Sequence, residues 1–114
     1  METAENNALI AKFMGAKEVK EGKNYYGFLV LDKKPYSIDE LKYDSDWNWL
    51  MAVIEKIEEK CVFVLIGRMF CEITYTNPLN TNVHFEKKLV SGVRINAVYA
   101  TCVEFIQWYN QKNQ

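Results

Sequence analysis

Residues 61 to 75, CVFVLIGRMFCEITY, leave the chain few ways to fold. Two β-branched and aromatic runs flank Gly67 and Arg68, which predicts a β-hairpin with these two residues as a type II′ turn. Glycine at the first turn position supplies the positive φ that this turn requires. The predicted cross-strand pairs are Ile66 with Met69, Val64 with Cys71, and Val62 with Ile73.

Both faces of this hairpin are apolar over most of its length. One face carries only apolar side chains, and the other carries Phe63, Leu65 and Phe70 before it becomes polar at Glu72 and Thr74. A sheet that is apolar on both sides needs a cover on both sides, supplied by helices or by another subunit.

The preceding stretch, YDSDWNWLMAVIEKIEEK at residues 43 to 60, predicts an α-helix. Asp44, Ser45 or Asp46 stands where an N-cap is expected, and apolar residues then recur at helical spacing. This apolar stripe consists of Trp47, Leu50, Met51, Ile54 and Ile57, and it is widened by Trp49 and Val53.

The same stretch also has a functional interpretation, because carboxylates beside tryptophans are typical of sugar-binding clefts. Asp44 and Asp46 would then act as a general acid and base in an enzyme with its acids near Trp47. Capping and core packing explain every residue of the stretch without a pocket. The structural interpretation is therefore favoured.

The remaining elements follow from periodicity and turn signals. Asn6 or Asn7 is expected to cap a short helix that carries Leu9, Ile10 and Phe13 and ends at Gly15. Before residue 43, the further predictions are an exposed loop at 16 to 24, a strand at 25 to 31, a turn at 32 to 35, and a helical turn with a capping box at 37 to 40. After the hairpin, they are a loop at 76 to 81, a strand at 82 to 90, and a C-terminal helix from Ile95. Ser91 is a possible cap of this helix, and Trp108 lies off its apolar stripe.

The predicted element order is α-β-α-β-β-β-α. It defines an α+β domain in which an antiparallel sheet of three to four strands is flanked by helices, as an α/β/α-type sandwich. At 114 residues, 49% of them hydrophobic, the chain is expected to form one domain over residues 1 to 114.

Composition and charge exclude several classes of protein. The formal net charge of −1 argues against a dedicated nucleic-acid or membrane-surface binder. The first fifteen residues lack the basic flank and apolar run of a signal peptide, and no stretch is apolar enough to span a membrane. We therefore expect a cytoplasmic protein with no membrane partner, and reduced thiols at its three cysteines.

The sequence predicts no catalytic residue, metal site or cofactor. His84 is the only histidine, and Cys61, Cys71 and Cys102 lie on different predicted elements without ligand spacing. Strand alternation places Cys71 and His84 on opposite faces of the sheet, which argues against a Cys–His nucleophile. We therefore expect that the protein is not an enzyme.

One short segment has the charge to hold an anion. Lys87, Lys88 and Arg94 flank Ser91-Gly92 just before the last predicted helix, where they could contact a phosphate or a nucleic-acid backbone. The segment lacks a glycine-rich phosphate loop. A solvated charged loop is the favoured interpretation, and a nucleic-acid accessory factor that uses this turn is the alternative.

The aromatic residues outnumber what one side of a small sheet buries. The surplus consists of Tyr25, Tyr26, Trp49, Phe28, Phe63, Phe70, Trp108 and Tyr109. They either complete a second layer within the chain, which we favour, or form an interface with an unidentified protein partner or a second copy.

Three stretches carry a family resemblance: LIAKFMG at 9 to 15, LKYDSDWNWLMAVIEKIE at 41 to 58, and INAVYATCVEFIQWYNQ at 95 to 111. Together they resemble the phage ABA-sandwich domain of small proteins from prophages and mobile elements of Bacteroides-type bacteria. The resemblance implies a sheet between helical layers and brings no catalytic residues. Ala52 departs from it, because relatives often show proline there, and residues 16 to 40 match no part of it.

The absence of a catalytic constellation and the excess of aromatic residues predict the same kind of function, and the resemblance indicates its setting. We expect a small intracellular accessory protein of phage or mobile-element type, without enzymatic activity, that binds another macromolecule.

Overall fold

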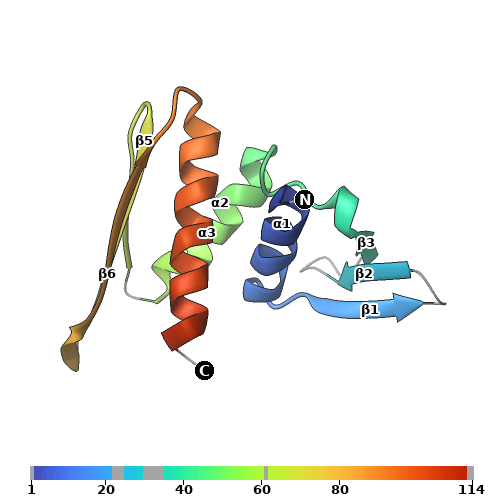
Figure 1. The fold of residues 1–114 in the computed structure, drawn as a ribbon, viewed down its shortest axis with the longest axis horizontal. Helices are drawn as coiled ribbons and strands as arrows, with labels where there is room; N and C mark the ends of the chain where they lie inside the picture. The colour runs from blue at the N-terminus through green and yellow to red at the C-terminus, as the bar shows by residue number, and fades with distance from the viewer. Residues whose placement is uncertain (1, 22–24, 30–34, 61, 113–114) are drawn as a thin grey trace.

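The computed structural model describes residues 2–21, 25–29, 35–60 and 62–112, which form three α-helices, one short 3-10 turn and two three-stranded antiparallel sheets (Figure 1). In chain order they are α1 (Glu2–Phe13), β1 (Lys17–Glu21), β2 (Tyr25–Leu29), β3 (Pro35–Ser37), the turn η1 (Ile38–Glu40), α2 (Trp47–Glu58), β4 (Val62–Ile66), β5 (Phe70–Asn77), β6 (Asn80–Val90) and α3 (Arg94–Lys112). The predicted α+β class, with an antiparallel sheet packed against helices, is confirmed.

The C-terminal sheet has the strand order β4-β5-β6, and the register of its first hairpin differs from the prediction. Ile66 pairs with Cys71 rather than with Met69, so four residues rather than two lie between the last paired residues of the hairpin. Gly67 N–H donates to the carbonyl of Phe70 at 2.9 Å. The only described glycine with positive φ is Gly15, so the predicted type II′ turn at Gly67 is wrong.

Gly67 is needed for space instead of for its φ angle. A Cβ atom at this position would overlap the ring of Phe70, which lies directly over the glycine. The register error is two residues, and side chains alternate with a period of two along a strand. The predicted assignment of side chains to the two sheet faces is therefore unchanged.

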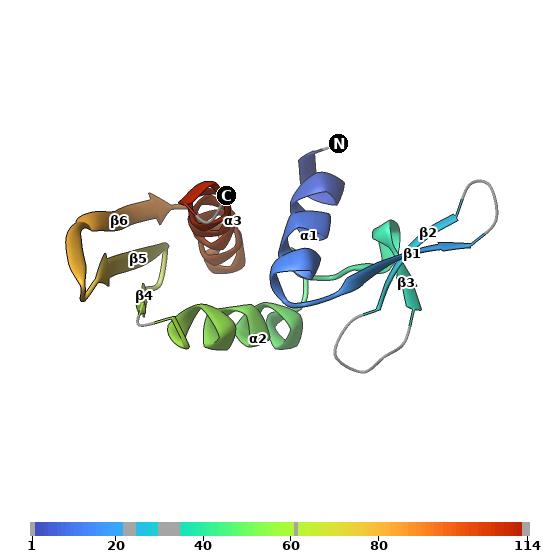
Figure 2. The same cartoon turned by 90° about the horizontal axis from the view of Figure 1, so that it is seen from below.

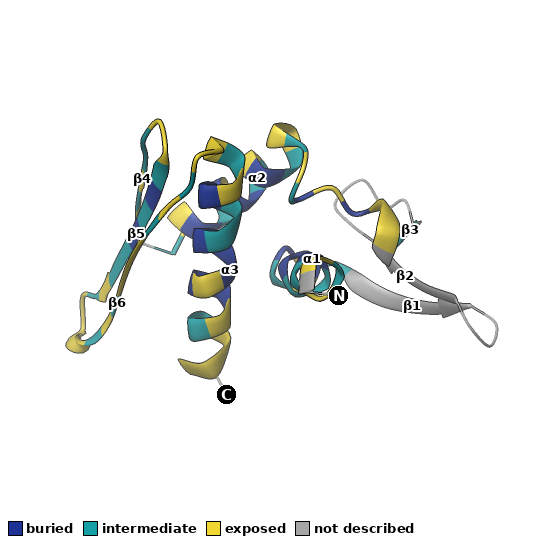
Figure 3. Ribbon diagram, turned by 45° about the horizontal axis from the view of Figure 1, so that its top comes forward, coloured by how far each residue is buried: buried dark blue, intermediate teal, exposed yellow. Residues whose placement is uncertain are grey.

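The helices all lie on one side of the β4-β5-β6 sheet, where α3 runs along β5 and β6 and α2 lies beside β4 (Figures 1 and 2). The buried core lies between this sheet and α2 and α3, and it continues between α3 and α1 (Figure 3). Its fully buried side chains include Ile10, Leu50, Ile57, Cys71, Ile73, Val98, Cys102, Phe105 and Ile106.

Aromatic rings extend this core along the C-terminal half of α3. Trp108, predicted to lie off the apolar stripe, packs on the sheet with its ring centroid 5.5 Å from that of Tyr75 and 5.3 Å from that of Phe85. Phe105 lies against the same two rings. Trp108 and Tyr109, two of the surplus aromatic residues, are thus partly buried within the chain.

The other face of this sheet is not covered by the described helices. Phe63 is 65% exposed and Leu65 is 43% exposed, so the expectation that the chain itself covers both faces is wrong for these residues. The physical reason is that α1, the one described helix that does not pack on the sheet, lies on the far side of α3 from the sheet (Figure 2).

The N-terminal sheet replaces the single strand and the loop expected before α2. β1 falls within residues 16 to 24, predicted to be an exposed loop, and it pairs with β2 so that Val19 lies opposite Gly27. β3 pairs with the other edge of β2. The charged sequence KEVKE of β1 has little strand propensity, so backbone pairing with β2 stabilises it. Most of the turn predicted at 32 to 35 lies outside the described residues.

The end of α1 follows the predicted local chemistry, and its start does not. Gly15 has φ +90° and ends α1 in a Schellman motif, in which the Ala16 N–H donates to the Ala11 carbonyl at 2.9 Å. The helix begins at Glu2 rather than at Asn6 or Asn7, so neither asparagine is its cap. The predicted loop at 76 to 81 is also shorter, because β5 extends to Asn77 and β6 begins at Asn80.

Candidate functional site

The two acidic residues near Trp47, Asp44 and Asp46, form hydrogen bonds within the protein. Asp46 caps α2, and its carboxylate accepts a hydrogen bond from the Asn48 N–H at 2.8 Å. Asp44 lies in the turn before the helix and accepts a hydrogen bond from the Asn7 side chain at 3.0 Å. The predicted capping role is therefore confirmed for Asp46, and Asp44 links this turn to α1.

Asn7 is the centre of a polar cluster that joins α1, α3 and the segment before α2. Its amide donates to the Leu41 carbonyl at 3.3 Å, and its oxygen accepts a hydrogen bond from the Tyr99 hydroxyl at 3.0 Å. Burial, and then the negative charge of Asp44, raises the pKa of Tyr99 to about 12. The cluster is satisfied within the protein, which gives it a structural role.

A pocket of about 460 Å³ lies beside this cluster. Its lining includes Thr3, Asn7, Asp39, Lys42, Asp44 and Ser45. Neither Trp47 nor Trp49 lines it, and the Trp49 ring packs edge-on against Tyr36 and Tyr43 at 5.2 and 5.0 Å between centroids. The indoles and carboxylates of this stretch therefore do not line this pocket together.

The predicted basic turn is partly assembled at one end of the β4-β5-β6 sheet. The Arg94 Nε–H donates to the Arg68 carbonyl at 3.3 Å, and the Ser91 N–H donates to the Met69 carbonyl at 2.8 Å. These contacts tie the β4–β5 turn to the β6–α3 connection. Lys88 belongs to the same end, with its ammonium 4.5 Å from the centroid of the Phe70 ring.

We call Arg68, Lys88 and Arg94 the basic tip. Lys87 does not share its face, because strand alternation places Lys87 opposite Ile73 on the helix-covered side and Lys88 on the other side. The chain has no acidic residue between Glu59 and Glu72 or between Glu86 and Glu104. The segments that form the basic tip therefore carry only positive charges. The nearest acidic residue in the strand register is Glu72, which pairs with Lys88.

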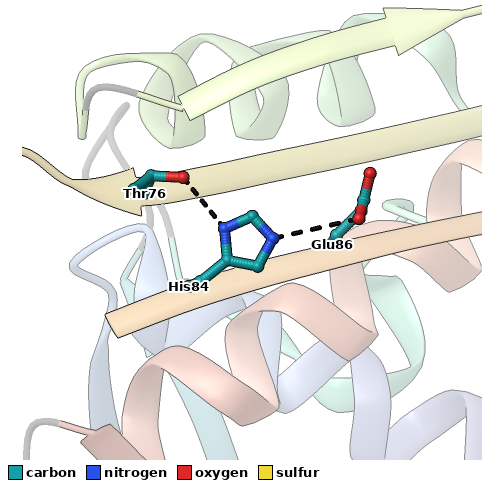
Figure 4. Close-up of polar contacts among 3 residues, drawn as sticks. All are labelled: Thr76, His84 and Glu86. Carbon is teal, nitrogen blue, oxygen red and sulfur yellow. Dashed lines mark hydrogen bonds and ion pairs between the residues drawn. The ribbon is translucent and has the colours of Figure 1, made fainter. Parts of the chain in front are cut away.

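His84 forms a small exposed polar group with two neighbours (Figure 4). Its Nδ1 lies 2.9 Å from the Thr76 hydroxyl oxygen, and its Nε2 lies 3.9 Å from a carboxylate oxygen of Glu86. A hydroxyl, an imidazole and a carboxylate in this order are the groups of a nucleophile–base relay. All three side chains are exposed, so water competes for both contacts, and the group lacks the enclosed surroundings that such chemistry needs.

The described cysteines are part of the core. Cys71 and Cys102 are fully buried, and burial raises the pKa of the Cys71 thiol to about 11 and that of Cys102 well above its usual value. Cys71 and His84 point to opposite sheet faces, as the alternation predicted. Cys61 lies outside the described residues. Over the described ranges, no group of three or more histidine, cysteine or acidic side chains is placed to hold a metal ion.

The uncovered side of the sheet carries several exposed apolar residues. We call it the open face and define its apolar part by Phe63, Leu65, Phe70 and Val90, of which Val90 is 73% exposed. The two-sided apolar pattern identified Phe63 and Leu65 but assigned them to a cover within the chain. Arg68 was missed as a site residue, because its proximity to Arg94 depends on a contact across 26 positions of sequence.

Comparisons of the chain with protein-family models, curated proteins and solved structures give no match. None of the helices in the described part of the chain is both long and apolar enough to cross a bilayer.

Proposed function

We propose that the protein is a non-enzymatic accessory protein that binds a macromolecular partner through the open face of the β4-β5-β6 sheet. The observation that carries this proposal is the exposure of Phe63 and Leu65, at 65% and 43%, on a sheet face where the described helices supply no cover. Contiguous apolar side chains rimmed by polar groups are typical of interaction surfaces, and aromatic residues are enriched in them. Here the rim consists of Glu72, Thr74, Glu86 and Lys88.

The roles of the polar residues support a binding function over catalysis. The acids near Trp47 stabilise helix α2 and the α1 contact, and the buried thiols have raised pKa values that disfavour the reactive thiolate. His84 is exposed on strand β6. The resemblance to phage ABA-sandwich proteins adds the proposed setting, which is the cytoplasm of a cell that carries a phage or mobile element.

Site-specific photo-crosslinking tests this proposal. A photoreactive phenylalanine analogue replaces Phe63 in one variant and Leu79 in another, within cells that naturally express the protein. Leu79 is the matched control, because it is 95% exposed but lies in the β5–β6 turn instead of on the face of the sheet. We expect a discrete crosslinked partner from position 63 and none from position 79.

The purified partner then provides the quantitative test. Phe63→Ser should weaken binding by at least ~10-fold, as expected for an aromatic side chain at the centre of an interface, and Leu79→Ser should leave it unchanged. Equal crosslinking at both positions, or equal affinities of the two serine variants, would contradict the open face as the binding surface.

A second candidate function is a nucleic-acid accessory factor. The hydrogen bond from the Arg94 side chain to the Arg68 carbonyl favours it, because it brings two basic residues together at the end of the sheet where Lys88 lies over the Phe70 ring. Cations that contact phosphates, beside an aromatic ring on which bases stack, are typical of single-strand binding surfaces.

Adjacent lysines give this second candidate a matched test. Binding of a labelled single-stranded oligonucleotide should weaken steeply with salt, and Lys88→Glu should weaken it more than Lys87→Glu, since only Lys88 shares the open face with the basic tip. Equal effects of the two substitutions, or no retention at low salt, would exclude the basic tip as a nucleic-acid site.

A further inference from the structure

The two outer edges of the β4-β5-β6 sheet differ in charge. β6, at one edge, runs for 11 residues and carries Glu86, Lys87 and Lys88. β4, at the other edge, is the five-residue strand VFVLI, which contains no charged residue, proline or glycine. Charged residues and prolines on edge strands are the usual means by which proteins prevent pairing with another chain. β6 has this protection and β4 does not.

The position of β4 in the sheet makes its edge available for pairing. Among the described strands, β4 neighbours only β5, so its other edge has no strand partner (Figure 2). Exposed Phe63 and Leu65 alternate with Val64 and Ile66 along this edge. An unpaired strand of this composition binds a strand of complementary pattern through backbone hydrogen bonds and apolar contacts.

We propose that β4 pairs in antiparallel orientation with β4 of a second copy of the chain, with the two Val64 residues opposite each other across a two-fold axis. The two sheets become one six-stranded sheet, and their open faces become continuous. This pairing concerns the edge of the sheet, and it holds whatever binds the open face.

The sequence of β4 is complementary to itself in this register. Phe63 of each copy lies directly opposite Leu65 of the other, on the open face, and these aromatic–aliphatic pairs occur twice by symmetry. Directly opposed apolar residues of this kind stabilise antiparallel strands. Centring the pair on Val64 also uses all five residues of the strand, which every shifted register reduces.

The charges on β6 favour pairing of β4 with β4 over pairing of β4 with β6, which would extend into an open filament. Pairing of β4 with β6 of another copy would place Glu86 or Lys88 against apolar residues and would leave further edges free to add copies. Pairing of β4 with β4 uses the uncharged edge of both copies and closes at two. Lys60, just before the strand, does not oppose the pairing, because its ammonium lies 4.8 Å from the Tyr109 ring centroid.

The size of the contact sets the expected affinity. A five-residue strand pair is smaller than the roughly 1,600 Å² of a standard stable interface. The dimer is therefore expected to exchange with the monomer in the micromolar range, and a single low concentration would not reveal it.

Sedimentation velocity from roughly 1 to roughly 300 μM measures the solution mass over the range in which a contact of this size forms. Two double variants provide the matched comparison. Phe63→Lys with Leu65→Lys places like charges opposite each other in the proposed register, whereas Phe63→Lys with Leu65→Glu places opposite charges there. Both positions are exposed, and circular dichroism verifies that each variant retains the fold of the wild type.

We expect the wild type and the Lys/Glu variant to approach twice the 13.4 kDa chain mass, and the Lys/Lys variant to remain monomeric throughout. A monomeric wild type, a dimeric Lys/Lys variant, or identical masses for the two double variants would overturn the proposal. Amide hydrogen exchange of wild-type β4 at both concentration limits is the second measurement, and unchanged protection would also overturn it. A monomeric wild type that still crosslinks through position 63 would leave the proposed function intact.

Discussion

The two faces of the β4-β5-β6 sheet are built from the same strands but have different surroundings. On the covered face, Ile73 and Cys71 are fully buried beneath α3, whereas on the open face Phe63 is 65% exposed. Both faces carry apolar residues, so strand alternation alone does not report burial. The difference arises because α2 and α3 cover one face and α1 packs against α3 instead of the sheet. An apolar strand face is evidence for a partner, and the fold decides whether that partner lies within the chain.

The same substitution on the two sides of the sheet, at Phe105 of α3 and at Phe63 of β4, should produce the largest contrast. Phe105 is fully buried at the centre of the aromatic cluster, so Phe105→Ala is expected to lower the free energy of unfolding by ~3–5 kcal/mol. Phe63→Ala removes an equal side chain from the open face and should change it by less than ~0.5 kcal/mol. Urea denaturation at low micromolar concentration, with circular dichroism as the probe, measures both values. A large loss for Phe63→Ala would mean that the open face is covered.

Two glycines at the ends of the strands should sharpen the comparison at smaller scale. Gly67→Ala forces the Phe70 ring away from the open face and is expected to cost about 1–3 kcal/mol, as for other overpacked sites. Gly92→Ala is the control, because no heavy atom lies near its added Cβ, and it should cost less than ~0.5 kcal/mol. Thermal or urea denaturation measures the pair. Equal stabilities would show that Phe70 does not lie over Gly67 in solution.

Local chemistry explains the parts of the fold that the sequence predicted. The cap at Asp46, the apolar stripe of α2 and the left-handed residue at Gly15 each depend on neighbours within a few positions. The strand β1 was missed because its charged residues carry no apolar period, and its existence depends on pairing with β2. The start of α1 was misplaced because Asn7, a good cap residue, is used in a tertiary hydrogen bond to Asp44.

Long-range contacts explain most of what the sequence could not predict about the candidate site. The hairpin register depends on the Phe70 ring over Gly67 and on the bond from Ser91 to Met69, neither of which follows from turn preferences. The basic tip likewise depends on the contact between Arg94 and the Arg68 carbonyl, which are 26 positions apart in the sequence. Strand alternation alone could have predicted that Lys87 and Lys88 lie on opposite faces of the sheet.

Titration of buried thiols should distinguish the covered face in solution. The pKa of Cys71 is raised from 9.0 to about 11 by burial, so the folded protein keeps a proton that the unfolded chain loses. Stability from this group is complete below pH 9 and is lost as the pH rises from about 9 to 11. Urea denaturation at successive pH values should show this decline, and Cys71→Ala should reduce its slope. An unchanged slope would mean that the thiol is hydrated.

The open face should show the smallest effect, at its polar group. His84→Ala breaks the contacts with Thr76 and Glu86, but all three side chains are exposed and exchange these contacts for water. The free energy of unfolding should therefore change by less than ~0.5 kcal/mol at pH 7, with Thr76→Val as a matched variant of similar shape. A loss above ~1 kcal/mol in both variants would mean that water is excluded from this part of the face, because exposed polar contacts contribute less. In that case the open face would be covered in solution. The two sheet faces would then differ only in what covers them, which is a helix of the same chain on one face and another macromolecule on the other.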